Sequence, residues 1–198
     1  MQQVFVIHGG NAFNTYEEYL EYLKGKQVAL ADLDYKDWKH GLQSVLGQGY
    51  KVFTPRMPNG NNAKYLEWKL YFEKFLPLLD DNAIFVGHSL GGIFLAKYFS
   101  EEVITKKVKA VFLVAAPYNT ASQHPLADFI FPEGVASLEK NVDRIFLYHS
   151  TDDMVVPFSN FKQFVEDLPH AEIRVFEDRK HINQEEFPEL VADIQSLA

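Results

Sequence analysis

Ser89 is the residue of this chain best placed to act as a nucleophile, because it lies in the sequence GHSLG at residues 87–91. An apolar run at residues 83–86 precedes it, and a helical pattern follows from residue 92. A G-x-S-x-G between a strand and a helix is typical of a nucleophile elbow, a turn so tight that both flanking positions need glycine. The turn would raise the serine hydroxyl above the edge of the sheet, where a histidine can reach it. The first amides of the helix would face a developing oxyanion. The alternative at this point is an ordinary glycine-rich turn.

An acid and a base follow Ser89 in the chain, each just past an apolar run. Asp152 and Asp153 come after residues 144–147, and His181 comes after residues 172–176. Serine, then acid, then histidine is the chain order of the α/β-hydrolase arrangement, whereas chymotrypsin and subtilisin use other orders. Either residue type alone is common in turns and on surfaces. The three together, each at a strand exit, predict a catalytic triad.

A second amide for an oxyanion hole is expected after the first strand. Residues 4–7 are apolar and are followed by the sequence HGGN at residues 8–11. In this type of site, one amide comes from the residue after the serine, here Leu90, and the other from a loop after an earlier strand. We expect Gly10 to supply it, with Asn11 as the second choice. A dinucleotide-binding turn is the alternative, but the G-x-G-x-x-G pattern is missing.

The elements that must position these residues alternate between strand and helix. Alternation of this kind predicts a parallel sheet with helices on both faces, and ligand sites at the carboxyl ends of the strands. Each candidate residue above lies at such an end. We therefore expect a three-layer α/β/α fold around a six-stranded, mainly parallel sheet. The predicted strands span residues 4–7, 51–54, 83–86, 109–114, 144–147 and 172–176, and the predicted helices span 36–46, 63–76, 92–102, 159–168 and 187–197.

Composition narrows the functional classes. The 198 residues are 47% hydrophobic, which predicts a single globular domain over residues 1–198. The formal net charge of −8 argues against a nucleic-acid partner. The chain has no cysteine, no apolar run of membrane-spanning length and no H-E-x-x-H pattern. We expect no metal, no membrane partner, no signal peptide and a cytoplasmic location.

The chain resembles the α/β-hydrolase superfamily, and within it the small single-domain serine hydrolases related to retinoblastoma-binding protein nine. The resemblance rests on His8-Gly9, Trp38, the sequence PRMP at residues 55–58, the GHSLG elbow, the sequence DDMVVP at residues 152–157 and the sequence KHIN at residues 180–183.

The resemblance implies the strand order 2-1-3-4-5-6, no cofactor and a Ser89–Asp153–His181 triad. Asp153 is favoured over Asp152 because the family's acid stands four residues before a proline, here Pro157. Asp152 would then cap the turn or accept hydrogen bonds from backbone amides.

Two departures from the family accompany this resemblance. Lys180 stands where the family has a glycine before the catalytic histidine. The stretch between His8 and Trp38 is about 20 residues longer than in small members.

The added stretch, residues 11–34, is a possible lid. Tyr16, Tyr19, Leu20 and Leu23 share one face of a predicted helix that leaves directly from the oxyanion loop. The alternative is a surface helix whose aromatic face packs on the domain. We expect Tyr16 to contact substrate.

A second possible cover lies between residues 117 and 140. Tyr118 and Phe131 would form a pocket wall there, or belong to the core. His88, beside the nucleophile, completes the predicted substrate-binding group. Of the other histidines, His8 is expected to brace the oxyanion loop and His149 to lie near the acid, while His40, His124 and His170 are expected on the surface.

The predicted reaction is hydrolysis of a small-molecule ester, or less readily an amide, through an acyl-enzyme. A partner-binding protein that keeps the fold with little or no turnover is one alternative. An acyltransferase using the same site is another. We expect a monomer or a small homo-oligomer.

Overall fold

The computed structural model describes residues 1–119 and 125–197, and at its centre lies a parallel sheet. Within these residues the sheet has six strands in the order β2-β1-β3-β4-β5-β6, and every neighbouring pair is parallel. Both the predicted strand number and the predicted order are confirmed. The strands are β1 (Gln2–Ile7), β2 (Tyr50–Phe53), β3 (Ala83–His88), β4 (Val108–Val114), β5 (Ile145–Ser150) and β6 (Glu172–Phe176).

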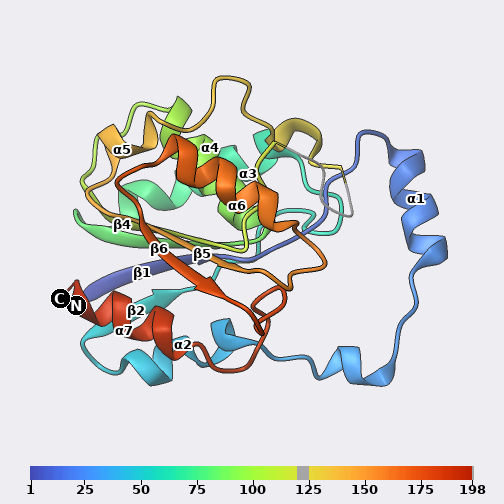
Figure 1. Ribbon diagram of the computed structural model, residues 1–198, viewed down its shortest axis with the longest axis horizontal. Coiled ribbons are helices and arrows are strands. Elements are labelled where there is room, and N and C mark those ends of the chain that lie inside the picture. Colours follow the sequence, from blue (N-terminus) through green and yellow to red (C-terminus); the bar gives the residue numbers. More distant parts are fainter. Residues whose placement is uncertain (120–124, 198) are drawn as a thin grey trace.

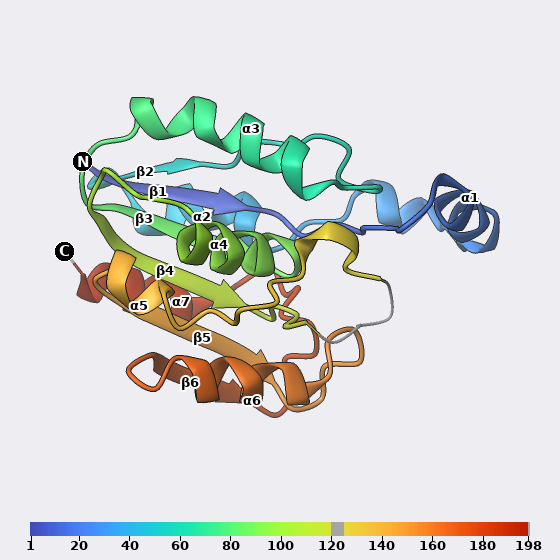
Figure 2. The ribbon, with the colours of Figure 1, turned by 90° about the horizontal axis from the view of Figure 1, so that it is seen from above.

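Helices cover both faces of the sheet and complete the predicted three layers (Figures 1 and 2). One face carries α3 (Tyr65–Phe75), α4 (Leu90–Glu101), α5 (Leu138–Asn141) and α6 (Phe158–Asp167), and the other carries α2 (Trp38–Leu46) and α7 (Pro188–Ser196). Short 3-10 helices lie at η1 (Leu30–Leu33), η2 (Leu76–Leu78) and η3 (Ala127–Phe129). In the described part of the chain, no helix combines the length and apolar character needed to cross a bilayer.

The sheet separates two hydrophobic cores, and the alternation of side chains along β1 shows why. Phe5 and Ile7 pack into the core under α3 and α4. Val4 and Val6 pack into the core under α2 and α7. All four side chains are at most 1% exposed. A strand buried on both faces reads as a continuous apolar run, which is why β1 was recognisable in the sequence.

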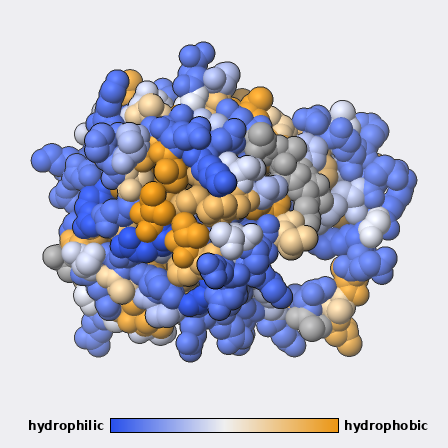
Figure 3. All heavy atoms as spheres, viewed as in Figure 1, coloured by the Kyte–Doolittle hydropathy of each residue, from blue (hydrophilic) through white to orange (hydrophobic). Residues whose placement is uncertain are grey.

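Most of the stretch of residues 11–34 forms an arm that stands away from the body of the molecule, whereas Ala12 and Phe13 near its start are buried. The arm contains η1 and the helix α1 (Tyr16–Gly25), which Thr15 and Glu18 cap at its start and in which no residue is buried. In Figure 1 α1 lies beside the sheet's carboxyl end, and in Figure 3 open background separates part of the arm from the body. The predicted helix is present. Its apolar face is not packed as a whole, because Tyr16 is 61% and Leu23 42% exposed.

Tyr19 and Tyr22 attach α1 to the rest of the chain. Their rings lie 5.6 and 5.2 Å from the ring of Phe13, which is buried. The side-chain amide of Asn11 also donates to the hydroxyl of Tyr22 at 3.3 Å. The helix is therefore tied to the segment that leaves β1.

Candidate active site

Ser89 occupies a sharp turn between β3 and α4. Its backbone has φ 55° and ψ −121°, a conformation that side chains rarely adopt. A Cβ at Gly87 would lie 2.3 Å from the carbonyl oxygen of Gly91, and one at Gly91 would lie 2.4 Å from that of Ile7. Because backbone occupies both places, only glycine fits there. The turn leaves Ser89 partly exposed, whereas its two neighbours in the chain are buried.

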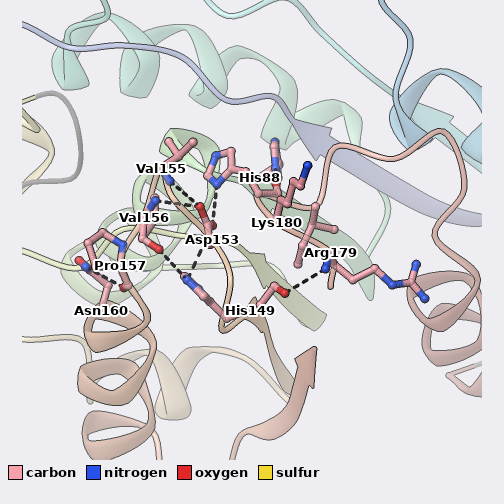
Figure 4. A network of polar contacts seen from close by, with 12 residues as sticks. His88, His149, Asp153, Val155, Val156, Pro157, Asn160, Arg179 and Lys180 are labelled. Carbon is pink, nitrogen blue, oxygen red and sulfur yellow. Dashed lines mark hydrogen bonds and ion pairs between the residues drawn. The ribbon is translucent and has the colours of Figure 1, made fainter. Parts of the chain in front are cut away.

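His181 and Asp153 form a buried pair at the exits of β6 and β5. Nδ1 of His181 lies 2.8 Å from Oδ2 of Asp153. The other carboxylate oxygen accepts the amides of Val155 and Val156 at 2.7 and 3.0 Å, in the network shown in Figure 4. An anionic carboxylate accepts only, so the Nδ1–H of His181 is the donor and Nε2 keeps its lone pair. That is the tautomer of a general base.

Asp152 bonds to Ser150 and Lys180, while the imidazole of His181 bonds to Asp153, so Asp152 holds the backbone of the histidine loop. Its Oδ1 accepts the hydroxyl of Ser150 at 2.5 Å and the amide of Lys180 at 2.8 Å. The Ser150 hydroxyl, with help from the Lys180 amide, lowers the pKa of the Asp152 carboxyl. The expected hydrogen bonding of Asp152 to backbone is confirmed.

Lys180 has a left-handed backbone, with φ 49°. Glycine adopts this conformation without steric cost, which accounts for a glycine at the corresponding family position. Lysine adopts it here while its amide is held by Asp152. The departure seen in the sequence therefore leaves the turn before His181 in place.

His149 lies behind the acid, as expected. It is 1% exposed, and its Nε2 is 2.9 Å from the carbonyl oxygen of Val156 and 3.7 Å from Oδ2 of Asp153. Burial lowers its pKa below the ordinary value. The neutral ring then donates its Nε2–H to Val156 and closes the loop that carries Asp153 (Figure 4).

His88 supports the backbone of His181. Its Nε2 lies 2.8 Å from the carbonyl oxygen of His181, and its Nδ1 lies 3.4 Å from Nζ of Lys39. Burial, followed by the Lys39 ammonium, lowers the pKa of His88 well below the ordinary value. Neutral His88 therefore accepts from Lys39 and donates to His181. Its role in substrate binding stays a prediction.

Lys39 was not recognised in the sequence as part of the site. Its ammonium also pairs with the buried carboxylate of Asp37, just before α2. No motif surrounds it. The sequence predicts a solvent-exposed side chain for a lysine in the first turn of an amphipathic helix. Only the contact with His88 in the structure shows that Lys39 belongs to the site.

The loop after β1 lies directly against the elbow. A Cβ at Gly9 would lie 3.1 Å from Cβ of Ser89, and one at Gly10 would lie 3.4 Å from the Leu90 side chain. His8 braces this loop, since its Nε2 accepts the amide of Met57 at 2.8 Å and its Nδ1 lies 2.5 Å from the carbonyl oxygen of Gly9.

A turn at residues 59–62 packs on the outer side of the same loop. The amide of Asn11 donates to the carbonyl oxygen of Gly60 at 2.9 Å, and a Cβ at Gly10 would lie 2.4 Å from that oxygen. The Asn11 amide is thus engaged, which leaves Gly10 as the better donor candidate. This turn was missed in the sequence, although Asn59-Gly60 is a common turn dipeptide and follows β2.

Tyr118 and Phe131, which follow β4, contribute to the core. Phe131 is fully buried and Tyr118 is 9% exposed, with ring centroids 4.8 Å apart. The Tyr118 hydroxyl donates to Asp167 on α6 at 2.5 Å, and burial together with this carboxylate raises its pKa. Of the two interpretations offered for this pair, the structure supports core packing, because Phe131 exposes no surface to a substrate. His124 lies outside the described residues.

Comparisons with known proteins agree with the fold and with membership of a hydrolase family. The sequence model of the family described as "Serine hydrolase" matches residues 30–190, a stretch that begins after α1. The protein "Serine hydrolase RBBP9" of Rattus norvegicus is 28% identical over 162 residues, which cover 80% of this chain and 83% of that protein.

Two solved structures illustrate the likeness of fold. The ydeN gene product from B. subtilis has a TM-score of 0.79 at 18% identity, covering 100% of this chain and 98% of that one. A meta-cleavage product hydrolase from Pseudomonas fluorescens has a TM-score of 0.69 at 14% identity, covering 100% and 90%. These structures share the α/β-hydrolase fold with this chain.

Proposed function

Because this chain belongs to the serine hydrolase family, we propose that it cleaves a carboxylic ester, or less readily an amide, through Ser89, His181 and Asp153. The observation that carries the proposal is the buried contact of 2.8 Å between His181 and Asp153, which lies at the same sheet edge as the strained serine turn. Such a pair fixes the tautomer that can take a proton from a serine.

In the proposed reaction, Nε2 of His181 takes the hydroxyl proton of Ser89 as the oxygen attacks the substrate carbonyl. Asp153 stabilises the imidazolium that forms, and its second oxygen stays on the amides of Val155 and Val156. His181 then gives the proton to the leaving group. Water, activated by the same ring, releases the acyl group from Ser89.

The oxyanion is proposed to bind the amides of Leu90 and Gly10. Leu90 is the first residue of α4, a position whose N–H has no partner inside a helix. Gly10 lies against Leu90 and is held from behind by Gly60. Two such donors, fixed before the reaction, stabilise negative charge without reorganising. Neither a cofactor nor a metal ion is needed for this chemistry.

A series of p-nitrophenyl esters from acetate to laurate tests the proposal. We expect turnover that is highest for short and medium acyl groups and is lost in Ser89→Ala. A folded protein that cleaves none of these esters would support a binding function. Faster loss of the acyl group when an added alcohol competes with water would support the acyltransferase alternative.

A further inference from the structure

A polar cavity lies between the arm and the body of the molecule, beside the proposed oxyanion loop. Its volume is about 470 Å³. Tyr16 and Tyr19 of α1 form one wall, and residues 59–62 together with Lys64 and Glu67 form the other. Figure 2 shows α1 outside the body, beyond the start of α3.

The groups that line the cavity are uncommon for a site that binds an acyl chain. Three are the neutral side-chain amides of Asn59, Asn61 and Asn62, and two are the charged groups of Lys64 and Glu67. Among the described lining residues there is no aliphatic side chain. Ligand sites are usually lined mainly by apolar groups with a few polar ones, so this lining indicates a polar ligand.

The charges balance, and two hydrogen bonds within the protein hold three of the polar side chains. The carboxylate of Glu67 accepts the side-chain amide of Asn59 at 2.9 Å. The ammonium of Lys64 donates to the carbonyl oxygen of Phe13 at 2.6 Å. One positive and one negative group favour a neutral ligand over an anion or a cation. Amides and phenols both donate and accept, as hydroxyl groups require, and the tyrosine rings offer flat apolar faces.

The cavity is joined to the reacting centre through backbone. Gly60 lies in its wall, and its carbonyl oxygen accepts the amide of Asn11 and touches Gly10. Tyr22 lies outside the cavity but on the same helix as Tyr16 and Tyr19, and its hydroxyl accepts the side-chain amide of Asn11. A group held in the cavity would therefore be fixed relative to the Gly10 amide and to Ser89.

We propose that this cavity binds the polyhydroxylated alcohol portion of the substrate, so that the enzyme cleaves short acyl esters of sugar-like alcohols. The inference rests on the proposed function, because it assigns a substrate class to the same serine. A hydroxylated ring would lie against Tyr16 and exchange hydrogen bonds with the asparagine turn. The arm of residues 11–34 would then set specificity for the alcohol.

Two acetates with the same reacting group test the inference. Methyl 6-O-acetyl-glucoside and cyclohexylmethyl acetate both carry a primary acetate on a six-membered ring, and they differ in ring hydroxyls. Acetate release gives kcat/KM for each. We expect the glucoside to be preferred by at least about tenfold, because a site that binds hydroxyls disfavours the analogue without them. Tyr16→Ala and Asn61→Ala should each bring this ratio toward one.

Tyr71→Ala is the matched control, since this tyrosine of α3 is 38% exposed and lies outside the cavity. It should leave the ratio unchanged. Hydrolysis of p-nitrophenyl acetate without preference for the glucoside would overturn the inference and leave the proposed function intact. A folded protein that cleaves no ester and does not react with a fluorophosphonate would overturn both.

Discussion

Replacing Asp153 with asparagine should invert the tautomer of His181, and the structure shows how. One carboxylate oxygen accepts two amides, those of Val155 and Val156, and the other accepts the Nδ1–H of His181. In Asp153→Asn, the amide oxygen must stay on the two backbone donors, because an NH₂ there would oppose them. The NH₂ then faces His181, donates to Nδ1 and moves the ring proton to Nε2.

A ring protonated at Nε2 cannot accept the proton of Ser89. We expect kcat for p-nitrophenyl acetate to fall by about 10⁴, the loss that the wrong tautomer causes in a serine protease triad. This corresponds to roughly 5 kcal/mol of transition-state stabilisation. The variant should remain folded, because the substitution is isosteric, and its circular dichroism should match that of the wild type.

Asp152→Asn is the control. Its amide oxygen can still accept from Ser150 and Lys180, so kcat should fall by less than roughly tenfold. Asp153→Asn with more than about a tenth of wild-type kcat would refute the argument, since the tautomer would then not matter. A larger loss in Asp152→Asn than in Asp153→Asn would reverse the assignment of the acid.

Three further predictions concern the loop after β1, the helix α2 and two buried histidines. Gly10→Ala places a Cβ 2.4 Å from the carbonyl oxygen of Gly60, which forces the loop to move; kcat should fall by about 10²–10³ in the ester assay. Gly41→Ala on α2, where a Cβ meets nothing within 4 Å, should keep full activity and unfold at slightly higher temperature. An equal loss of kcat in Gly10→Ala and Gly41→Ala would refute the role given to Gly10. The lowered pKa values of buried His88 and His149 mean that the unfolded chain binds more protons, so the free energy of unfolding should fall as pH drops below 6.5. Urea titrations at several pH values measure this dependence, and each histidine should contribute a slope of up to about 1.4 kcal/mol per pH unit. His149→Gln should remove the contribution of that histidine. A slope that stays the same in His149→Gln would contradict the assignment.

Most of the fold was predictable because its local and global signals agree. The apolar runs of β1 and β3 are buried on both faces, and the turn at Ser89 needs glycine for a steric reason that any chain must obey. The α6 and α7 helices begin within one residue of their predicted starts, at Phe158 and Pro188. The short α5 was missed, since its few residues carry too little periodicity to recognise.

The supporting contacts of the site could not be predicted, because they join residues that are distant in the chain. Lys39 meets His88, and Gly60 meets Gly10, through the arrangement of strands rather than through any local pattern. For α1 the helical spacing of the apolar residues could be recognised in the sequence. Which of them would pack was not, since the helix binds Phe13 through Tyr19 and Tyr22 and leaves Tyr16 exposed.

Mass spectrometry after treatment with a fluorophosphonate tests the central claim most directly, because this reagent phosphonylates a serine only where a base activates it. We predict one adduct per chain, located on Ser89 in the digested protein and missing in Ser89→Ala and in His181→Ala. An unmodified, folded wild type, or an adduct on another serine that persists in Ser89→Ala, would contradict the account.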